Sequence, residues 1–105
     1  WNVLLVMADD WRPEIGCYGA PGMLTPNVDK LAAGGVRFDR AYCQFPVCNP
    51  SRVSMLTARY PNTTGVVFNG TKLRDLHPDW VTLPEHFKSH GYVTATAGRK
   101  AGQPV

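Results

Sequence analysis

Short apolar runs along this chain of 105 residues alternate with stretches that carry helix signals. Residues 3–8 are continuously apolar, which is typical of a strand buried on both faces of a parallel sheet. Residues 36–43 begin with alternating apolar and polar positions, and residues 92–97 form another short run of the same kind. We expect one strand in each of these three segments.

Helix signals lie between the expected strands. Residues 25–34 begin with a threonine cap before a proline and end at a glycine pair, which predicts a helix. Residues 50–58 predict a second helix with Pro50 at its first position, and residues 82–90 predict a third that begins with a capping box. Residues 60–80 are rich in proline, glycine and polar residues and are predicted to be mostly loop.

The order of these elements predicts an α/β fold. Strand, helix, strand, helix, helix, strand is typical of a mostly parallel sheet flanked by helices. A hydrophobic share of 44% suits one small domain, and a net charge of +3 without a basic stripe argues against a nucleic-acid partner. No apolar run approaches the length of a membrane span, so we expect none.

Four residues form the candidate site. Asp9 and Asp10 follow the first expected strand, where ligands gather in α/β sheets. Cys48 precedes the second expected helix, whose amino end favours anions, and Arg52 follows one turn later. Each feature alone has an ordinary explanation. The two aspartates are common turn residues, a single cysteine is usually a small buried side chain, and an arginine in a first helical turn is usually solvated. Together they fit metal-assisted attack on an anionic ester, with Ca²⁺ or Mg²⁺ preferred over Zn²⁺.

The other cysteines and two sequons bear on the compartment. Cys17 and Cys43 either pair in an oxidising compartment or remain free, and three cysteines leave at least one unpaired. Asn62 and Asn69 each begin an acceptor sequon for N-glycosylation, which slightly favours a secretory route.

The chain resembles the formylglycine-dependent sulfatase family. Residues 48–52 read Cys-Asn-Pro-Ser-Arg and match the Cys-x-Pro-Ser-Arg signature of that family. Residues 5–10 look like its first strand and metal-binding aspartates. Residues 45–52, 61–65 and 81–87 look most like the iduronate-2-sulfatase branch. The resemblance implies the N-terminal part of an alkaline-phosphatase-like sulfatase fold.

The resemblance also implies an activity: a sulfuric ester hydrolase that acts on sulfated sugars, with iduronate 2-sulfate of glycosaminoglycans as a candidate substrate. A formylglycine-generating enzyme would oxidise Cys48, and the hydrated aldehyde would attack sulfur with one hydroxyl and expel sulfate with the other. Asp9, Asp10 and the modified Cys48 would bind one Ca²⁺, and Arg52 would stabilise the hydrate. Such an enzyme would be lysosomal or secreted in a eukaryote, and periplasmic or extracellular in a bacterium.

Departures from the family pattern limit what the chain does alone. Ala58 stands where the family usually has glycine, and after Gly98 the family's Lys and His are replaced by Arg99 and a different tail. We therefore expect residues 1–98 to be an N-terminal segment of a sulfatase catalytic domain, residues 99–105 to be a non-matching tail, and the isolated chain to be an inactive fragment. The alternatives are an inactive truncated sulfatase-like protein and a related phosphonate or phosphate monoester hydrolase.

Overall fold

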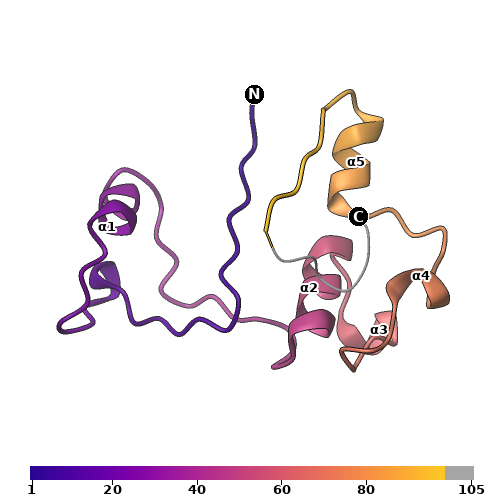
Figure 1. The fold of residues 1–105 in the computed structure, drawn as a ribbon, viewed down its shortest axis with the longest axis horizontal. Coiled ribbons are helices and arrows are strands. Elements are labelled where there is room, and N and C mark those ends of the chain that lie inside the picture. The colour runs from indigo at the N-terminus through magenta and orange to yellow at the C-terminus, as the bar shows by residue number, and fades with distance from the viewer. Residues whose placement is uncertain (99–105) are drawn as a thin grey trace. The chain divides into compact units, whose positions relative to one another are not determined.

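The computed structural model describes residues 1–98, and these contain short helices joined by extended segments (Figure 1). The chain divides into two compact units, Trp1–Tyr42 and Cys43–Val105. The helical elements are the 3₁₀ helix η1 (Gly16–Tyr18) and the α-helices α1 (Pro26–Ala33), α2 (Cys48–Thr57), α3 (Pro61–Thr64), α4 (Leu73–Leu76) and α5 (Leu83–Ser89).

In the first unit, α1 holds η1 through side chains at its own start. The expected helix is confirmed, with proline at its first position. The Thr25 hydroxyl accepts the Gly16 N–H at 2.8 Å and donates to Asp29 Oδ1 at 3.0 Å. The same carboxylate oxygen accepts the Cys17 N–H at 2.6 Å. Thr25 and Asp29 therefore tie the two elements together, beside the buried side chain of Ile15.

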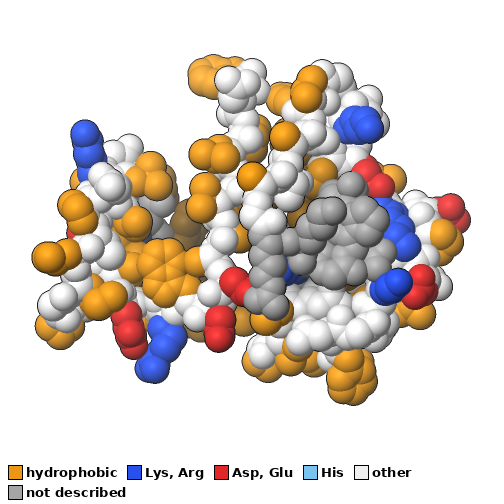
Figure 2. Space-filling model, in the orientation of Figure 1, with side chains coloured by type: hydrophobic (Ala, Val, Ile, Leu, Met, Phe, Trp, Pro, Cys, Tyr) orange, Lys and Arg blue, Asp and Glu red, His pale blue; other side chains and the backbone are white. Residues whose placement is uncertain are grey.

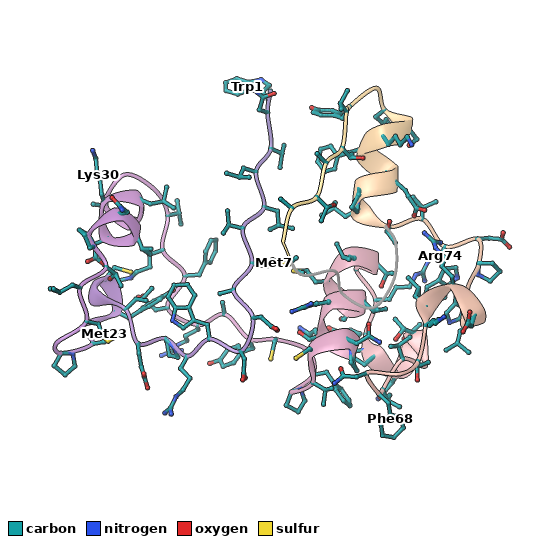
Figure 3. All side chains as sticks on the ribbon, in the orientation of Figure 1. Trp1, Met7, Met23, Lys30, Phe68 and Arg74 are labelled. Carbon is teal, nitrogen blue, oxygen red and sulfur yellow. The ribbon has the colours of Figure 1, made fainter. Side chains whose placement is uncertain are left out.

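The three expected strands are not strands in residues 1–98. A strand is defined by ladder hydrogen bonds to a neighbour, and apolar strand residues need cover on their faces. Here Leu4 is 88% exposed and Val93 is 98% exposed. Figure 2 shows hydrophobic side chains standing out on the surface, and Figure 3 shows Trp1 and Met7 along the extended N-terminal segment. The parallel sheet inferred from the apolar runs stays a prediction.

Residues 36–43, predicted to pair as a strand, make side-chain hydrogen bonds instead of a backbone ladder. The Tyr18 hydroxyl donates to the Phe38 carbonyl at 2.9 Å, and Arg37 donates to the Cys17 carbonyl. Arg37 also pairs with Asp39 at 2.7 Å, and that carboxylate raises the pKa of the guanidinium. Side-chain contacts to η1, rather than a backbone ladder, hold this segment.

In the second unit, a small core joins α2 to the segments that follow it. Val53 of α2, Val66 and Leu73 of α4 form the buried cluster, and the half-buried Trp80 packs against it. The Arg59 guanidinium lies 4.2 Å from the centroid of the Trp80 ring, within cation–π range. This core fixes the helix that begins at Cys48.

Residues 60–80, predicted as mostly loop, contain the one-turn helices α3 and α4. The buried Thr64 hydroxyl donates to the Pro61 carbonyl and accepts the Val66 N–H, both at 3.1 Å, which closes the end of α3. His77 stacks on Trp80 with ring centroids 3.6 Å apart, and its Nε2 lies 3.0 Å from the Thr64 carbonyl oxygen. Outside α3 and α4 this segment is turn and irregular backbone, so the prediction of a mostly loop segment is confirmed, and the two one-turn helices are what the composition did not indicate.

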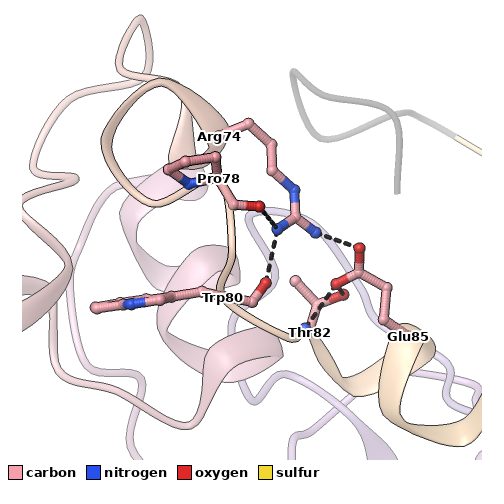
Figure 4. A network of polar contacts seen from close by, with 5 residues as sticks. All are labelled: Arg74, Pro78, Trp80, Thr82 and Glu85. Atoms are coloured by element: carbon pink, nitrogen blue, oxygen red, sulfur yellow. Dashed lines mark hydrogen bonds and ion pairs between the residues drawn. The ribbon is translucent and has the colours of Figure 1, made fainter. Parts of the chain in front are cut away.

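The capping box predicted for α5 is confirmed. The Glu85 carboxylate accepts the Thr82 N–H at 2.8 Å and the Thr82 hydroxyl at 2.7 Å. Arg74 extends this box, because it donates to Glu85 and to the carbonyls of Pro78, at 3.1 Å, and Trp80, at 2.6 Å (Figure 4). The network ties α4 to α5.

Candidate functional site

Cys48 is the first residue of α2, so the helix begins two residues earlier than the expected start at Pro50. Val47 precedes it as N-cap in an extended conformation, with φ −132° and ψ 139°. The Ser51 N–H donates to the Val47 carbonyl at 3.1 Å, which closes the first turn around the cysteine. The Cys48 side chain is exposed and its thiol is free. The nucleophile candidate therefore stands at the open amino end of a ten-residue helix.

The amino end of α2 offers fewer backbone donors than the sequence suggested. The Asn49 N–H is already bound to Asn69 Oδ1 at 3.0 Å, and Pro50 has no N–H. Cys48 therefore supplies the N–H that remains for an anion among the first three helical residues. The macrodipole still favours negative charge at this end of the helix.

Arg52 lies one turn beyond Cys48 on α2, as the spacing predicted. Residues four apart on an α-helix share a face, so both side chains start from the same side of α2. Arg52 is half-buried and takes part in interactions of its own. The next residue, Val53, lies about 100° further round the helix, is 8% exposed and anchors that face of α2 in the core. The helix is thus held by one face and presents the other.

Ala58 ends α2 in the left-handed region, with φ 54° and ψ 32°. Its N–H donates to the Ser54 carbonyl, as in a helix cap of the left-handed type. Glycine adopts this conformation without the steric cost of a Cβ atom. The alanine is therefore a strained end to the helix that carries Cys48.

Asp9 and Asp10 belong to the first unit, and both are exposed. Asp10 has φ 53°, an uncommon conformation for a residue other than glycine, although aspartate tolerates it better than most. Cys48 and Arg52 belong to the second unit, so the predicted site draws its residues from both units.

The side chains of the described residues match the predicted calcium site only in part. Carboxylate oxygens are the ligands that Ca²⁺ prefers, but a calcium shell takes about six to eight oxygens. Within residues 1–98, no group of three or more His, Cys, Asp or Glu side chains could hold a metal ion. His86 and His90 lie close, with ring centroids 4.4 Å apart, and both are exposed on α5. The donor type therefore fits calcium, and the number of donors does not.

Comparison with known proteins identifies the family. The family model described as Sulfatase matches residues 1–103. The chain belongs to the sulfatase family. It is 44% identical over 98 residues to iduronate 2-sulfatase of Mus musculus, a match covering 93% of this chain and 18% of that protein. It is 42% identical over 102 residues to arylsulfatase A of Bos taurus, covering 93% of this chain and 20% of that protein.

A third similar protein is a sulfatase with a different name. Steryl-sulfatase of Homo sapiens is 38% identical over 107 residues, covering 93% of this chain and 18% of that protein. The chain therefore spans about a fifth of the length of the curated relatives it matches. Membership places the chain in a family of sulfuric ester hydrolases with an alkaline-phosphatase-like fold. No helix within residues 1–98 is long and apolar enough to cross a bilayer.

Asn49, the residue beside the cysteine, has a role that no sequence pattern predicts. The Asn49 side chain donates to the carbonyls of Phe68, at 3.2 Å, and Thr71, at 2.8 Å. The Asn69-Gly70 pair is a turn signal that predicts a loop there. Nothing in the sequence links that turn to a residue twenty positions earlier, so only the fold reveals the contact.

Proposed function

We propose that this chain carries the nucleophile-bearing part of a sulfatase that removes sulfate from sulfated sugars. The observation that carries the proposal is the exposed Cys48 at the first position of α2, with Arg52 one turn later, inside a sulfatase match over residues 1–103. A side chain at this place meets an anionic ester at the positive end of a helix dipole.

Cys48 serves as the precursor of formylglycine, which a formylglycine-generating enzyme makes by oxidising the thiol. The modified residue, once formed, supplies a hydroxyl nucleophile that a plain thiol lacks. Arg52 contributes a permanent positive charge on the same helix face, which favours a sulfate group near Cys48. Asp9, Asp10 and the modified Cys48 are the residues of this chain that would hold a Ca²⁺ ion, as part of a shell that needs further oxygen ligands, and the ion would supply Lewis-acid chemistry.

The proposed substrate is a sulfated carbohydrate, with iduronate 2-sulfate as the first candidate. Support for this choice comes from the 44% identity to a protein named iduronate 2-sulfatase. Two exposed sequon asparagines, Asn62 and Asn69, favour a lysosomal or secreted location in a eukaryote, whereas a bacterial source implies the periplasm or the exterior. Residues 3–8, 36–43 and 92–97 are the proposed strands of the parallel sheet.

Turnover of an aryl sulfate and the matching aryl phosphate tests the proposal. The assay uses the complete natural protein that contains this sequence, purified from its source, and compares it with a Cys48→Ala variant made in the same host. We expect sulfate release from the aryl sulfate, with less than a tenth of that rate on the aryl phosphate, and none from Cys48→Ala. Because Cys48 is exposed, its truncation leaves no core cavity.

Two results would count against the proposal. Faster turnover of the aryl phosphate would indicate a phosphate monoester hydrolase of the same superfamily. No turnover of either ester, with Cys48 unmodified, would indicate an inactive sulfatase-like protein.

A further inference from the structure

The residue that follows the cysteine makes three hydrogen bonds to one loop. The Asn49 side-chain amide donates to the Phe68 carbonyl at 3.2 Å and to the Thr71 carbonyl at 2.8 Å. Its backbone N–H donates to Asn69 Oδ1 at 3.0 Å. We call these three bonds the Asn49 clasp. The clasp joins the first turn of α2 to residues 68–71.

The partners fix the direction of every bond in the clasp. Carbonyl oxygens only accept, so the Asn49 side chain acts as a donor to Phe68 and Thr71. A backbone N–H only donates, so the Asn69 side chain acts as an acceptor. The two asparagines therefore have opposite roles, and the same chemical change at each should give opposite results.

The clasp meets a need that the helix cannot meet by itself. The Asn49 N–H lies in the first turn of α2, where no intrahelical acceptor exists. Val47, the N-cap residue, has no polar side chain with which to cap the helix. Asn69 replaces the missing cap from twenty residues away. Without it, the turn that carries Cys48 would be the end of α2 most prone to fray.

We infer that Asn49 is a positioning residue, which holds the Cys48 turn in place by clasping it to residues 68–71. It acts through the backbone of its neighbour and does not touch the reacting atoms. The clasp itself stands on the contacts above, and its value for catalysis rests on the proposed function. Figure 3 shows Phe68, whose carbonyl is one acceptor, with its ring directed away from the body of the unit, where it is 71% exposed.

Asparagine-to-aspartate changes at both ends of the clasp give the sharpest test. Asn49→Asp keeps the shape but replaces the donor with a carboxylate that faces carbonyl oxygens. Asn69→Asp keeps the acceptor and strengthens it with charge at a helix amino end. An acidic residue in the first turn ordinarily stabilises a helix. If the clasp did not form, Asn49→Asp should therefore stabilise α2. Asn62→Asp, at an exposed position of α3, is the matched control.

The experiment uses the unmodified 105-residue chain, labelled with ¹⁵N and ¹³C, and reads NMR shifts, amide exchange and thermal unfolding. Asn49→Asp should lower the midpoint of unfolding below the wild type and move the Cys48 Cα shift away from its helical value. Asn69→Asp should do neither, and should move the Asn49 amide proton downfield. Asn62→Asp should leave the Cys48 shift and the Asn49 exchange rate unchanged.

Asn69→Ala supplies a second arm if Asn49→Asp does not fold. Loss of one acceptor should speed exchange of the Asn49 N–H about fivefold, the factor that one typical hydrogen bond confers. The Ser51 N–H, which bonds inside the helix to Val47, should keep its exchange rate and so exclude unfolding of α2. Unchanged Asn49 exchange in Asn69→Ala would overturn the inference. So would an Asn49→Asp chain that is more stable than the wild type with the Cys48 shift unmoved. Neither readout needs sulfatase turnover, so a failure of the proposed function would leave this test intact.

Discussion

Neutralising Glu85 should destabilise the second unit in a pH-dependent way. Hydrogen bonds from the hydroxyl and N–H of Thr82, with a smaller contribution from the Arg74 guanidinium, lower the pKa of Glu85 from 4.5 to about 2. A carboxyl whose pKa is lower in the folded state stabilises that state when ionised. The stabilisation is complete above about pH 5 and is lost as the pH falls through about 2.

The size of this contribution follows from the shift and from the exposure of the side chain. At full strength, a pKa drop from 4.5 to about 2 would correspond to about 3 kcal/mol. The Glu85 side chain is 42% exposed, however, so solvent screens its charge interactions. We therefore expect Glu85→Gln to lower the free energy of unfolding by about 1 kcal/mol at pH 7, similar to the loss of a helix cap.

Urea unfolding followed by circular dichroism measures the effect between pH 7 and pH 2. The gap in unfolding free energy between the wild type and Glu85→Gln should be widest at pH 7 and should close towards pH 2. Glu14→Gln is the matched control, because Glu14 pairs with Arg12 at 3.2 Å on an open surface where both side chains are more than half exposed. Such pairs contribute little, so that variant should stay within about 0.5 kcal/mol of the wild type. A gap that is constant across this pH range would refute the reasoning.

Three further changes have defined outcomes. Ala58→Gly should raise the free energy of unfolding by about 0.5–1 kcal/mol in urea, because φ is 54° at this helix end; a loss of stability would contradict the left-handed cap. Leu73→Ala should cost about 2–4 kcal/mol in the same assay, because it empties part of the buried cluster, and Leu76→Ala, at an exposed position, should cost far less. Gly16→Ala should speed amide exchange at Cys17. The added Cβ would lie 2.5 Å from Asp29 Oδ2, so it should displace the carboxylate that accepts the Cys17 N–H. Unchanged exchange at Cys17 would show that the Asp29 side chain can move without losing that hydrogen bond.

Helix starts with strong local signals could be predicted from the sequence. The proline after Thr25 and the capping box of Thr82 and Glu85 each act within a few residues, and both helices begin where those signals place them. Pro50 predicts a start of α2 that is two residues too late, because proline is common at a first helical position but α2 begins at Cys48. In the structure Val47 accepts the first helical bond.

Contacts distant in sequence explain what could not be predicted. Residues 3–8 are apolar enough for a buried strand, but a strand forms only with a partner, and apolarity does not say where the partner lies. The one-turn helices in residues 60–80 depend on the packing of His77, Trp80 and the buried core. At the candidate site, spacing placed Cys48 and Arg52 on one helix face, whereas the Asn49 clasp joins residues that no local pattern connects.

The mass of one tryptic peptide tests the central claim most directly. Residues 41–52, which lie between Arg40 and the cleavage site after Arg52, contain Cys43 and Cys48. In protein from the natural source, we predict that this peptide is about 18 Da lighter than its unmodified form, with the change localised to Cys48 by fragmentation. A peptide in which Cys48 remains entirely a thiol would contradict the assignment of this residue as the precursor of a sulfatase nucleophile.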